Sequence, residues 1–84
     1  MEPEGYKKFL KGEIRKRIID LQEAGVKTSK GEPMSQAAIG RTLDPPVTGV
    51  SVHLVIAGKS ESRRIKAAIE RELGQAYWIR KEAA

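Results

Sequence analysis

Two adjacent prolines, Pro45 and Pro46, divide a stretch of small and apolar residues that runs from Met34 to Gly58. Proline has no backbone N–H, and the residue before a proline avoids the helical region of backbone conformation. A single helix therefore cannot run through this stretch. The pattern predicts two short helices joined by a tight turn, with longer helices before and after them supplying the rest of the core.

The first short helix is expected at about residues 35–43. The Ser35 hydroxyl can cap it by accepting a hydrogen bond from a backbone N–H two or three residues later, and Ile39 and Leu43 would face the core. A helix of about two turns is not stable alone, so it must be packed on both sides. Gly40 is costly inside a helix, which indicates that another helix approaches closely there.

The second short helix is expected at about residues 48–57, although Val50–Leu54 alternates as a strand would. Val52, Val55 and Ile56 also share one face of a helix. The sequence contains no second candidate strand, and a lone strand has nothing to pair with. The helix is therefore the preferred interpretation.

Longer amphipathic helices are expected at about residues 6–24 and 61–73, because their apolar residues are spaced mainly by three and four. In the first helix these residues are Tyr6, Leu10, Ile14, Ile18 and Leu21. In the second they are Ile65, Ala68, Ile69 and Leu73.

The two ends of the chain are expected to differ. Residues 1–5 predict a flexible leader before the domain at 6–84. The tail, residues 75–84, contains Tyr77 and Trp78, and burying such side chains is strongly favourable. We therefore expect the tail to pack on the core.

Composition limits the kind of protein this can be. The chain has 84 residues, enough for one domain, and no cysteine. With one histidine, His53, it offers no thiolate or multi-histidine metal site, and we expect neither metal nor cofactor. No apolar run approaches the roughly 20 residues of a membrane span, so the expected location is the cytoplasm, away from membranes.

An enzyme is not expected either. The single histidine has no recognisable nucleophile partner, and no glycine-rich phosphate loop occurs. The serines and aspartates lie at expected caps and turns. We therefore expect no catalytic residues and no small-molecule substrate.

The charge favours a polyanionic partner. Sixteen lysines and arginines against eleven acidic residues give a net charge of +5, and basic domains bind phosphates with release of counterions. Basic residues crowd the first helix and the segment containing Lys59, Arg63 and Arg64.

The order of elements from Ser35 to Gly74 resembles the lambda-repressor-like (Cro/repressor, Xre-type) helix-turn-helix domains. Gly49–Lys59, Ser62–Ile65 and Leu73-Gly74, with the Tyr77-Trp78 ending, look most like phage regulators of the Ner-like kind. The resemblance implies an all-α fold, a single domain of four to five helices containing a helix-turn-helix.

The resemblance also implies site residues. Gln36 matches the family's glutamine at the start of the second helix, which binds a phosphate, and Val52 and Val55 match the pair that anchors the recognition helix. The base-facing residues would be Thr48, Gly49, Val50, Ser51, His53 and Leu54. The phosphate-contacting residues would be Gln36, Lys59, Ser60, Arg63 and Arg64.

The sequence departs from the family pattern at the turn, where Asp44-Pro45-Pro46 adds about two residues and can alter the angle of the recognition helix. The base-facing set is also poor in polar groups. Direct readout would depend on Thr48, Ser51 and His53, with Val50 or Leu54 available for a thymine methyl. Discrimination between sequences is expected to be modest, or to use arms and DNA shape.

The expected function is a sequence-recognising transcriptional regulator of the phage or prophage repressor type, with helix 48–57 in the major groove of double-stranded DNA. A homodimer is expected, because one short helix buries little surface, and the apolar tail 77–79 is a candidate dimer surface. The alternative is a helical protein-interaction adaptor that uses the same fold without DNA. An RNA binder is disfavoured because the aromatic residues are mostly committed to the core.

Overall fold

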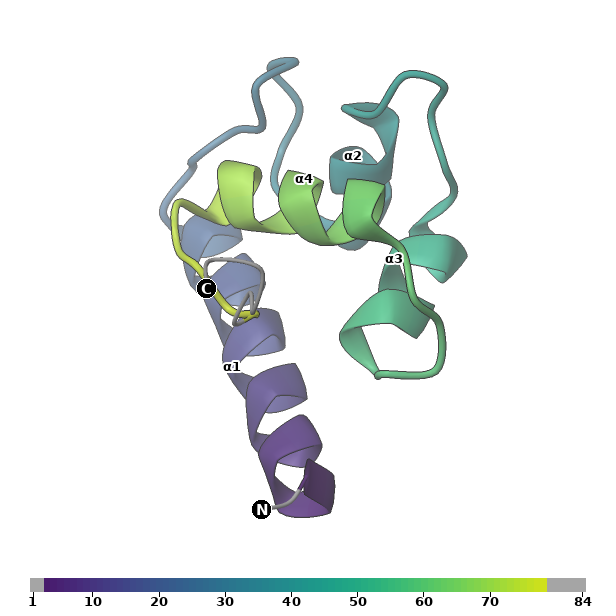
Figure 1. The fold of residues 1–84 in the computed structure, drawn as a ribbon. Helices are drawn as coiled ribbons and strands as arrows, with labels where there is room; N and C mark the ends of the chain where they lie inside the picture. The colour runs from purple at the N-terminus through teal and green to yellow at the C-terminus, as the bar shows by residue number, and fades with distance from the viewer. Residues whose placement is uncertain (1–2, 79–84) are drawn as a thin grey trace.

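The computed structural model describes the backbone of residues 3–78 and the side chains of residues 10–78. It contains α1 (Pro3–Glu23), α2 (Gln36–Arg41), α3 (Gly49–Ile56) and α4 (Arg63–Leu73). Within these residues there is no strand, only an isolated bridge between Lys27 and Pro33. The all-α prediction is confirmed. The three shorter helices gather around the C-terminal half of α1, and its N-terminal turns extend beyond them (Figure 1).

All four helices contribute to one apolar core, which burial of their apolar faces stabilises. Most positions expected from helical spacing are buried, and the exceptions with described side chains, Leu10 and Leu21 in α1, are partly buried and pack against the core. The buried apolar residues are Ile14, Ile18, Met34, Ala38, Ile39, Leu43, Val52, Val55, Ile56, Ile65, Ala68, Ile69, Leu73 and Tyr77.

The first helix starts earlier than the sequence predicts. It begins at Pro3 rather than Tyr6, so the expected leader at residues 1–5 is wrong for residues 3–5. A proline fits the first position of a helix, because its fixed φ is helical and its missing N–H would have had no partner in the helix. Met1 and Glu2 lie outside the described residues.

The second helix is shorter than predicted, ending at Arg41. The Thr42 hydroxyl donates to the Ile39 carbonyl at 2.6 Å, and the Leu43 N–H bonds the Gly40 carbonyl at 3.3 Å. These bonds close a tight turn that keeps Leu43 buried outside the helix. The connection to α3, residues 42–48, is therefore longer than the three or four residues typical of a helix-turn-helix.

Gly40 is required by this connection and not by a neighbouring helix, so that expectation is wrong. The Val47 N–H donates to the Gly40 carbonyl at 3.0 Å, which brings the returning chain onto α2. A Cβ on Gly40 would overlap the Val47 carbonyl oxygen and lie 3.3 Å from that of Thr48. The helix-to-helix approach occurs at Gly49, where a Cβ would lie 3.1 Å from the Ala37 Cα.

The described part of the tail packs on the core as predicted. Tyr77 is 7% exposed and meets Trp78 edge to face, with ring centroids 6.2 Å apart. The Glu70 carboxylate accepts hydrogen bonds from the backbone N–H groups of both aromatic residues, at 2.8 and 2.9 Å. The Lys66 ammonium lies 5.5 Å from the centre of the Trp78 ring. Residues 79–84 lie outside the described residues.

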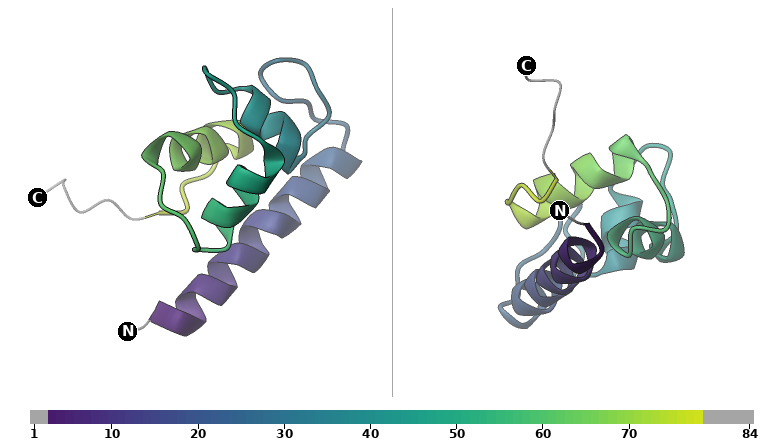
Figure 2. Two further views of the ribbon diagram at one scale, coloured as in Figure 1. Left: turned by 90° about the vertical axis from the view of Figure 1, so that its right-hand side faces the viewer. Right: turned by 60° about the horizontal axis from the view of Figure 1, so that its bottom comes forward.

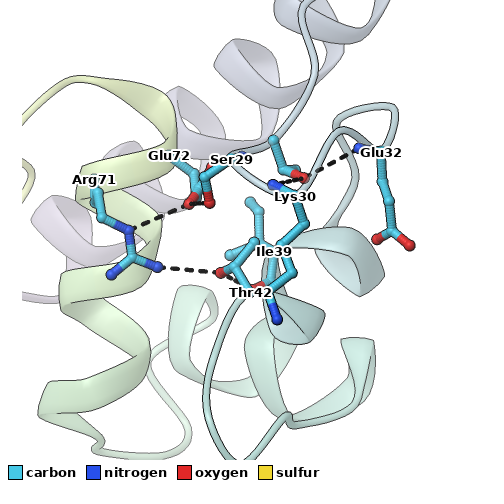
Figure 3. Close-up of polar contacts among 8 residues, drawn as sticks. Ser29, Lys30, Glu32, Ile39, Thr42, Arg71 and Glu72 are labelled. Atoms are coloured by element: carbon cyan, nitrogen blue, oxygen red, sulfur yellow. Dashed lines mark hydrogen bonds and ion pairs between the residues drawn. The ribbon is translucent and has the colours of Figure 1, made fainter.

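A polar network joins the loop after α1 to α4 and α2 (Figure 3). The N–H and hydroxyl of Ser29 donate to the Glu72 carboxylate at 2.8 and 2.6 Å. Arg71 donates to the same carboxylate at 3.2 Å and to the Thr42 hydroxyl at 3.2 Å. Three segments distant in sequence are thereby held in one arrangement.

Candidate nucleic-acid interface

The outer face of α3, which points away from the core, is not covered by another described segment. Val52, Val55 and Ile56 are buried, which fixes the orientation of the helix. Val50 and Leu54, one turn apart on the opposite side, are 68% and 36% exposed. In the left view of Figure 2, α3 lies toward the viewer with no other helix over it.

The expected polar readers on α3 have structural contacts of their own. Thr48 is the N-cap, and its hydroxyl oxygen accepts the Ser51 N–H at 3.2 Å. The same hydroxyl lies 3.3 Å from the Ser51 hydroxyl. Ser51 and His53 are half-buried beside the exposed apolar pair. Gly49 is not part of the exposed row, because it packs against Ala37.

Removing the cap should weaken α3. We expect Thr48→Ala to lower the free energy of unfolding by about 1 kcal/mol, because the first turn of the helix loses its side-chain acceptor. Thr48→Ser keeps an acceptor at the same place and should stay close to the original protein. Chemical denaturation followed by circular dichroism measures both, and equal stabilities for the alanine and serine variants would show that the cap contributes nothing.

Basic residues lie after the C-terminal end of α3 and beside the connection that precedes it. The Lys59 N–H donates to the Leu54 carbonyl at 2.9 Å, which holds Lys59 against the C-terminal end of the helix. The Arg64 guanidinium donates to the Pro45 carbonyl at 2.8 Å, which holds it at the turn before the helix. Arg63 is exposed at the start of α4.

Lys59, Arg63 and Arg64 form no ion pair with a carboxylate within residues 10–78, so the alternative that they serve in surface ion pairs receives no support. They share this with five other basic residues of the same range, which are Lys11, Arg15, Arg17, Lys27 and Lys30. The basic residues that do form ion pairs in this part of the chain are Lys16, Arg41, Lys66 and Arg71.

The remaining two candidate residues lie near the same elements. Gln36 is the first residue of α2, next to the Ser35 cap, and its neighbour Ala37 contacts Gly49 at the start of α3. Ser60 is exposed in the connection between α3 and α4. The cap of α4 is Ser62, whose hydroxyl accepts the Ile65 N–H at 3.2 Å.

Sequence reasoning missed the contacts that place these residues. The hydrogen bond from Arg64 to Pro45 joins α4 to the connection between α2 and α3. The contact of Gly49 with Ala37 joins α3 to α2. The only signal in the sequence is the pair of glycines, Gly40 and Gly49, on either side of the proline turn.

Two other kinds of feature are not found in the described part of the chain. Residues 3–78 contain no group of three His, Asp or Glu side chains able to hold a metal ion, and no helix among them is long and apolar enough to cross a membrane. Burial raises the pKa of Tyr77, although Arg17 opposes the shift; this residue belongs to the core.

Comparison with known proteins gave no relative: no protein-family model, curated protein or solved structure matches the chain. Its function must be inferred from its own residues.

Proposed function

We propose that this chain is a lambda-repressor-like helix-turn-helix domain that binds double-stranded DNA and regulates transcription in the manner of a phage or prophage repressor. In this proposal α2 and α3 are the two helices of the motif, and α3 enters the major groove. The observation that carries it is the exposed outer face of α3 together with nearby basic residues, Lys59, Arg63 and Arg64, that form no ion pair within residues 10–78.

The dimensions support this assignment. An α-helix such as α3 is about 10–12 Å in diameter with its side chains. The major groove of B-DNA is about 12 Å wide and admits one α-helix. Lys59, which follows α3, and Arg64, which bonds the connection before α3, would then reach the phosphates that border the groove, where such contacts set position rather than sequence.

A second copy is part of the proposal, because a single small module buries only about 600–1,000 Å² on DNA. Two copies would occupy half-sites about one helical turn apart. The tail is a poorer candidate for the dimer surface than the sequence suggests, because Tyr77 is buried in the core of its own chain.

Salt dependence tests the proposal. Duplex affinity should fall steeply with salt, and Arg63→Gln should reduce the slope of log affinity against log salt by about 0.9, the value for one lost phosphate contact. Arg41→Gln is the matched control, because it removes the same charge from an exposed residue that already pairs with Glu32. Fluorescence anisotropy on the full chain across a salt series gives both slopes.

The possible outcomes separate the explanations. A smaller slope for Arg63→Gln alone supports the interface. An equal change in both variants would mean that only net charge matters, and the absence of micromolar, salt-sensitive duplex binding would overturn the proposal.

A helical protein-interaction adaptor is the second candidate, favoured by the exposure of Val50 and Leu54. Binding through these side chains would bury apolar surface and respond weakly to salt. A protein partner whose affinity is insensitive to salt and is lost in Leu54→Asp would favour the adaptor over the DNA binder.

A further inference from the structure

The base-contacting surface available on α3 is chemically unusual for a reader of DNA. Its two most exposed side chains are Val50 and Leu54, which are purely apolar. They are four residues apart on a helix, so their Cβ atoms lie about 5–6 Å from one another on adjacent turns. Together they form an apolar ridge, Val50–Leu54, along the outside of the helix.

The usual readers of purines are missing from this helix. Guanine is recognised mainly by arginine or lysine and adenine by asparagine or glutamine, each through two hydrogen bonds. The α3 sequence, GVSVHLVI, contains none of these four residue types. Its polar side chains are Ser51 and His53, both half-buried, and the Ser51 hydroxyl lies beside that of the capping Thr48.

Only one group on the base edges of the major groove matches an apolar ridge. The C5 methyl of thymine is the single apolar group that the four base pairs present there. The charges near the ridge suit the same partner, because Lys59 directly follows α3 and Arg64 bonds Pro45 in the connection before it. An uncharged apolar partner would give these cations nothing to bind.

We propose that α3 selects its DNA by contact between the Val50–Leu54 ridge and thymine methyl groups. The protein therefore prefers thymine-rich half-sites. This inference rests on the proposed duplex binding and adds the chemical feature of the DNA that is read.

Replacing thymine by deoxyuridine tests the inference without changing the protein. Deoxyuridine keeps the base pair, the O4 acceptor and the phosphate charge, and removes only the methyl. Binding of the full chain to an alternating A·T duplex should weaken by about fourfold for each buried methyl lost, the factor expected for one buried methyl-sized group. A G·C duplex carrying 5-methylcytosine, which puts a methyl at the same position, should bind more tightly than unmethylated G·C.

Two variants locate the effect. Leu54→Ala should abolish most of the preference for thymine over deoxyuridine while keeping the salt dependence. Arg63→Gln should weaken binding to both duplexes equally and keep their ratio. Thermal melts establish that the variants fold, and the deoxyuridine comparison itself needs no variant.

Each outcome has a distinct meaning. Salt-sensitive duplex binding with equal affinity for thymine and deoxyuridine overturns the methyl inference and leaves the proposed function standing. Absence of salt-sensitive duplex binding overturns both. A dimer in solution that dissociates in Val50→Ser and does not bind DNA would show that the ridge is covered by a second copy, which also overturns the inference.

Discussion

Gly40→Ala is expected to lower the free energy of unfolding by roughly 2–3 kcal/mol, the range for inserting a group into a site with no room. The new Cβ would overlap the carbonyl oxygen of Val47, and this neighbour is backbone, held by the hydrogen bond from its own N–H to Gly40. It cannot rotate away as a side chain could. The helix propensity gained by replacing glycine, about 1 kcal/mol, does not offset the overlap.

The stability loss expected for Gly40→Ala is a large part of the total free energy of unfolding. Stability of about 0.05–0.15 kcal/mol per residue gives roughly 4–13 kcal/mol for a chain of this length. Each kcal/mol corresponds to about 4–8 °C in Tm for a small domain, so the expected loss is easily measured by thermal or chemical denaturation.

Gly12→Ala is the matched control. A Cβ on Gly12 would meet nothing within 4 Å, so the substitution should stabilise α1 by up to about 1 kcal/mol through helix propensity alone. The two variants make the same chemical change with opposite expected signs. If Gly40→Ala were as stable as Gly12→Ala, the chain after α2 would not return over Gly40.

The helices themselves could be predicted because their signals are local. In α4, a serine cap, apolar residues at helical spacing and a terminal glycine all lie within one short segment, and Ile65, Ile69 and Leu73 are buried as expected. The same reasoning overestimated α2, because the sequence marks where a helix must stop at Pro45 but not that Thr42 closes it earlier.

The contacts between segments could not be predicted. The sequence shows that Gly40 is unusual, but a close approach can come from a helix or from returning backbone, and only the path of residues 42–48 decides between them. The Ser29–Glu72 contact spans 43 positions, and no spacing rule relates such residues.

For the candidate site, the sequence predicted the buried face of α3 but not the contacts of its other residues. Helical spacing placed Val52 and Val55 on one face, and both are buried, whereas Val50 and Leu54 are exposed. The roles of the residues expected to face the bases depend on neighbours that the sequence does not identify. Thr48 caps the helix, whereas Gly49 packs against α2. Whether the remaining residues touch bases stays a prediction.

Glu72→Gln is expected to destabilise the protein by about 1.5–3 kcal/mol at neutral pH, the cost typical of losing hydrogen bonds to a charged group. The Glu72 side chain is only 4% exposed and accepts hydrogen bonds from the Ser29 N–H, the Ser29 hydroxyl and Arg71. A glutamine has nearly the same shape, but it has one acceptor oxygen and no charge, so it cannot accept all three.

The effect should depend on pH in a definite direction. Burial raises the pKa of Glu72, but the hydrogen bonds from Ser29 and the hydrogen bond and charge of Arg71 together lower the pKa below its ordinary value of 4.5. A folded-state pKa below the unfolded one means that the carboxylate contributes its full stability above about pH 4.5 and loses it as pH falls through the lower folded value. The stability difference between the original protein and Glu72→Gln should therefore shrink on acidification below pH 4.5.

Asp20→Asn provides the control for a general effect of losing an acidic group. Asp20 forms an ion pair with Lys16 on the surface of α1 at 3.2 Å, and exposed pairs of this kind contribute only about 0–1 kcal/mol. Denaturation at several pH values should show a large, pH-dependent loss for Glu72→Gln and a small one for Asp20→Asn. Equal losses would mean that net charge, rather than the Ser29 contact, is responsible.

A double-mutant cycle with Ser29→Ala identifies the partner. This substitution removes the hydroxyl donor but keeps the backbone N–H, so it should cost less than Glu72→Gln. If the Ser29 hydroxyl bonds Glu72, the loss in the double variant should be smaller than the sum of the two single losses, because the second substitution removes a bond that is already broken. Strict additivity would show that the Ser29 hydroxyl does not bond Glu72, and the destabilisation at Glu72 would then have to come from the bonds of the Ser29 N–H and Arg71.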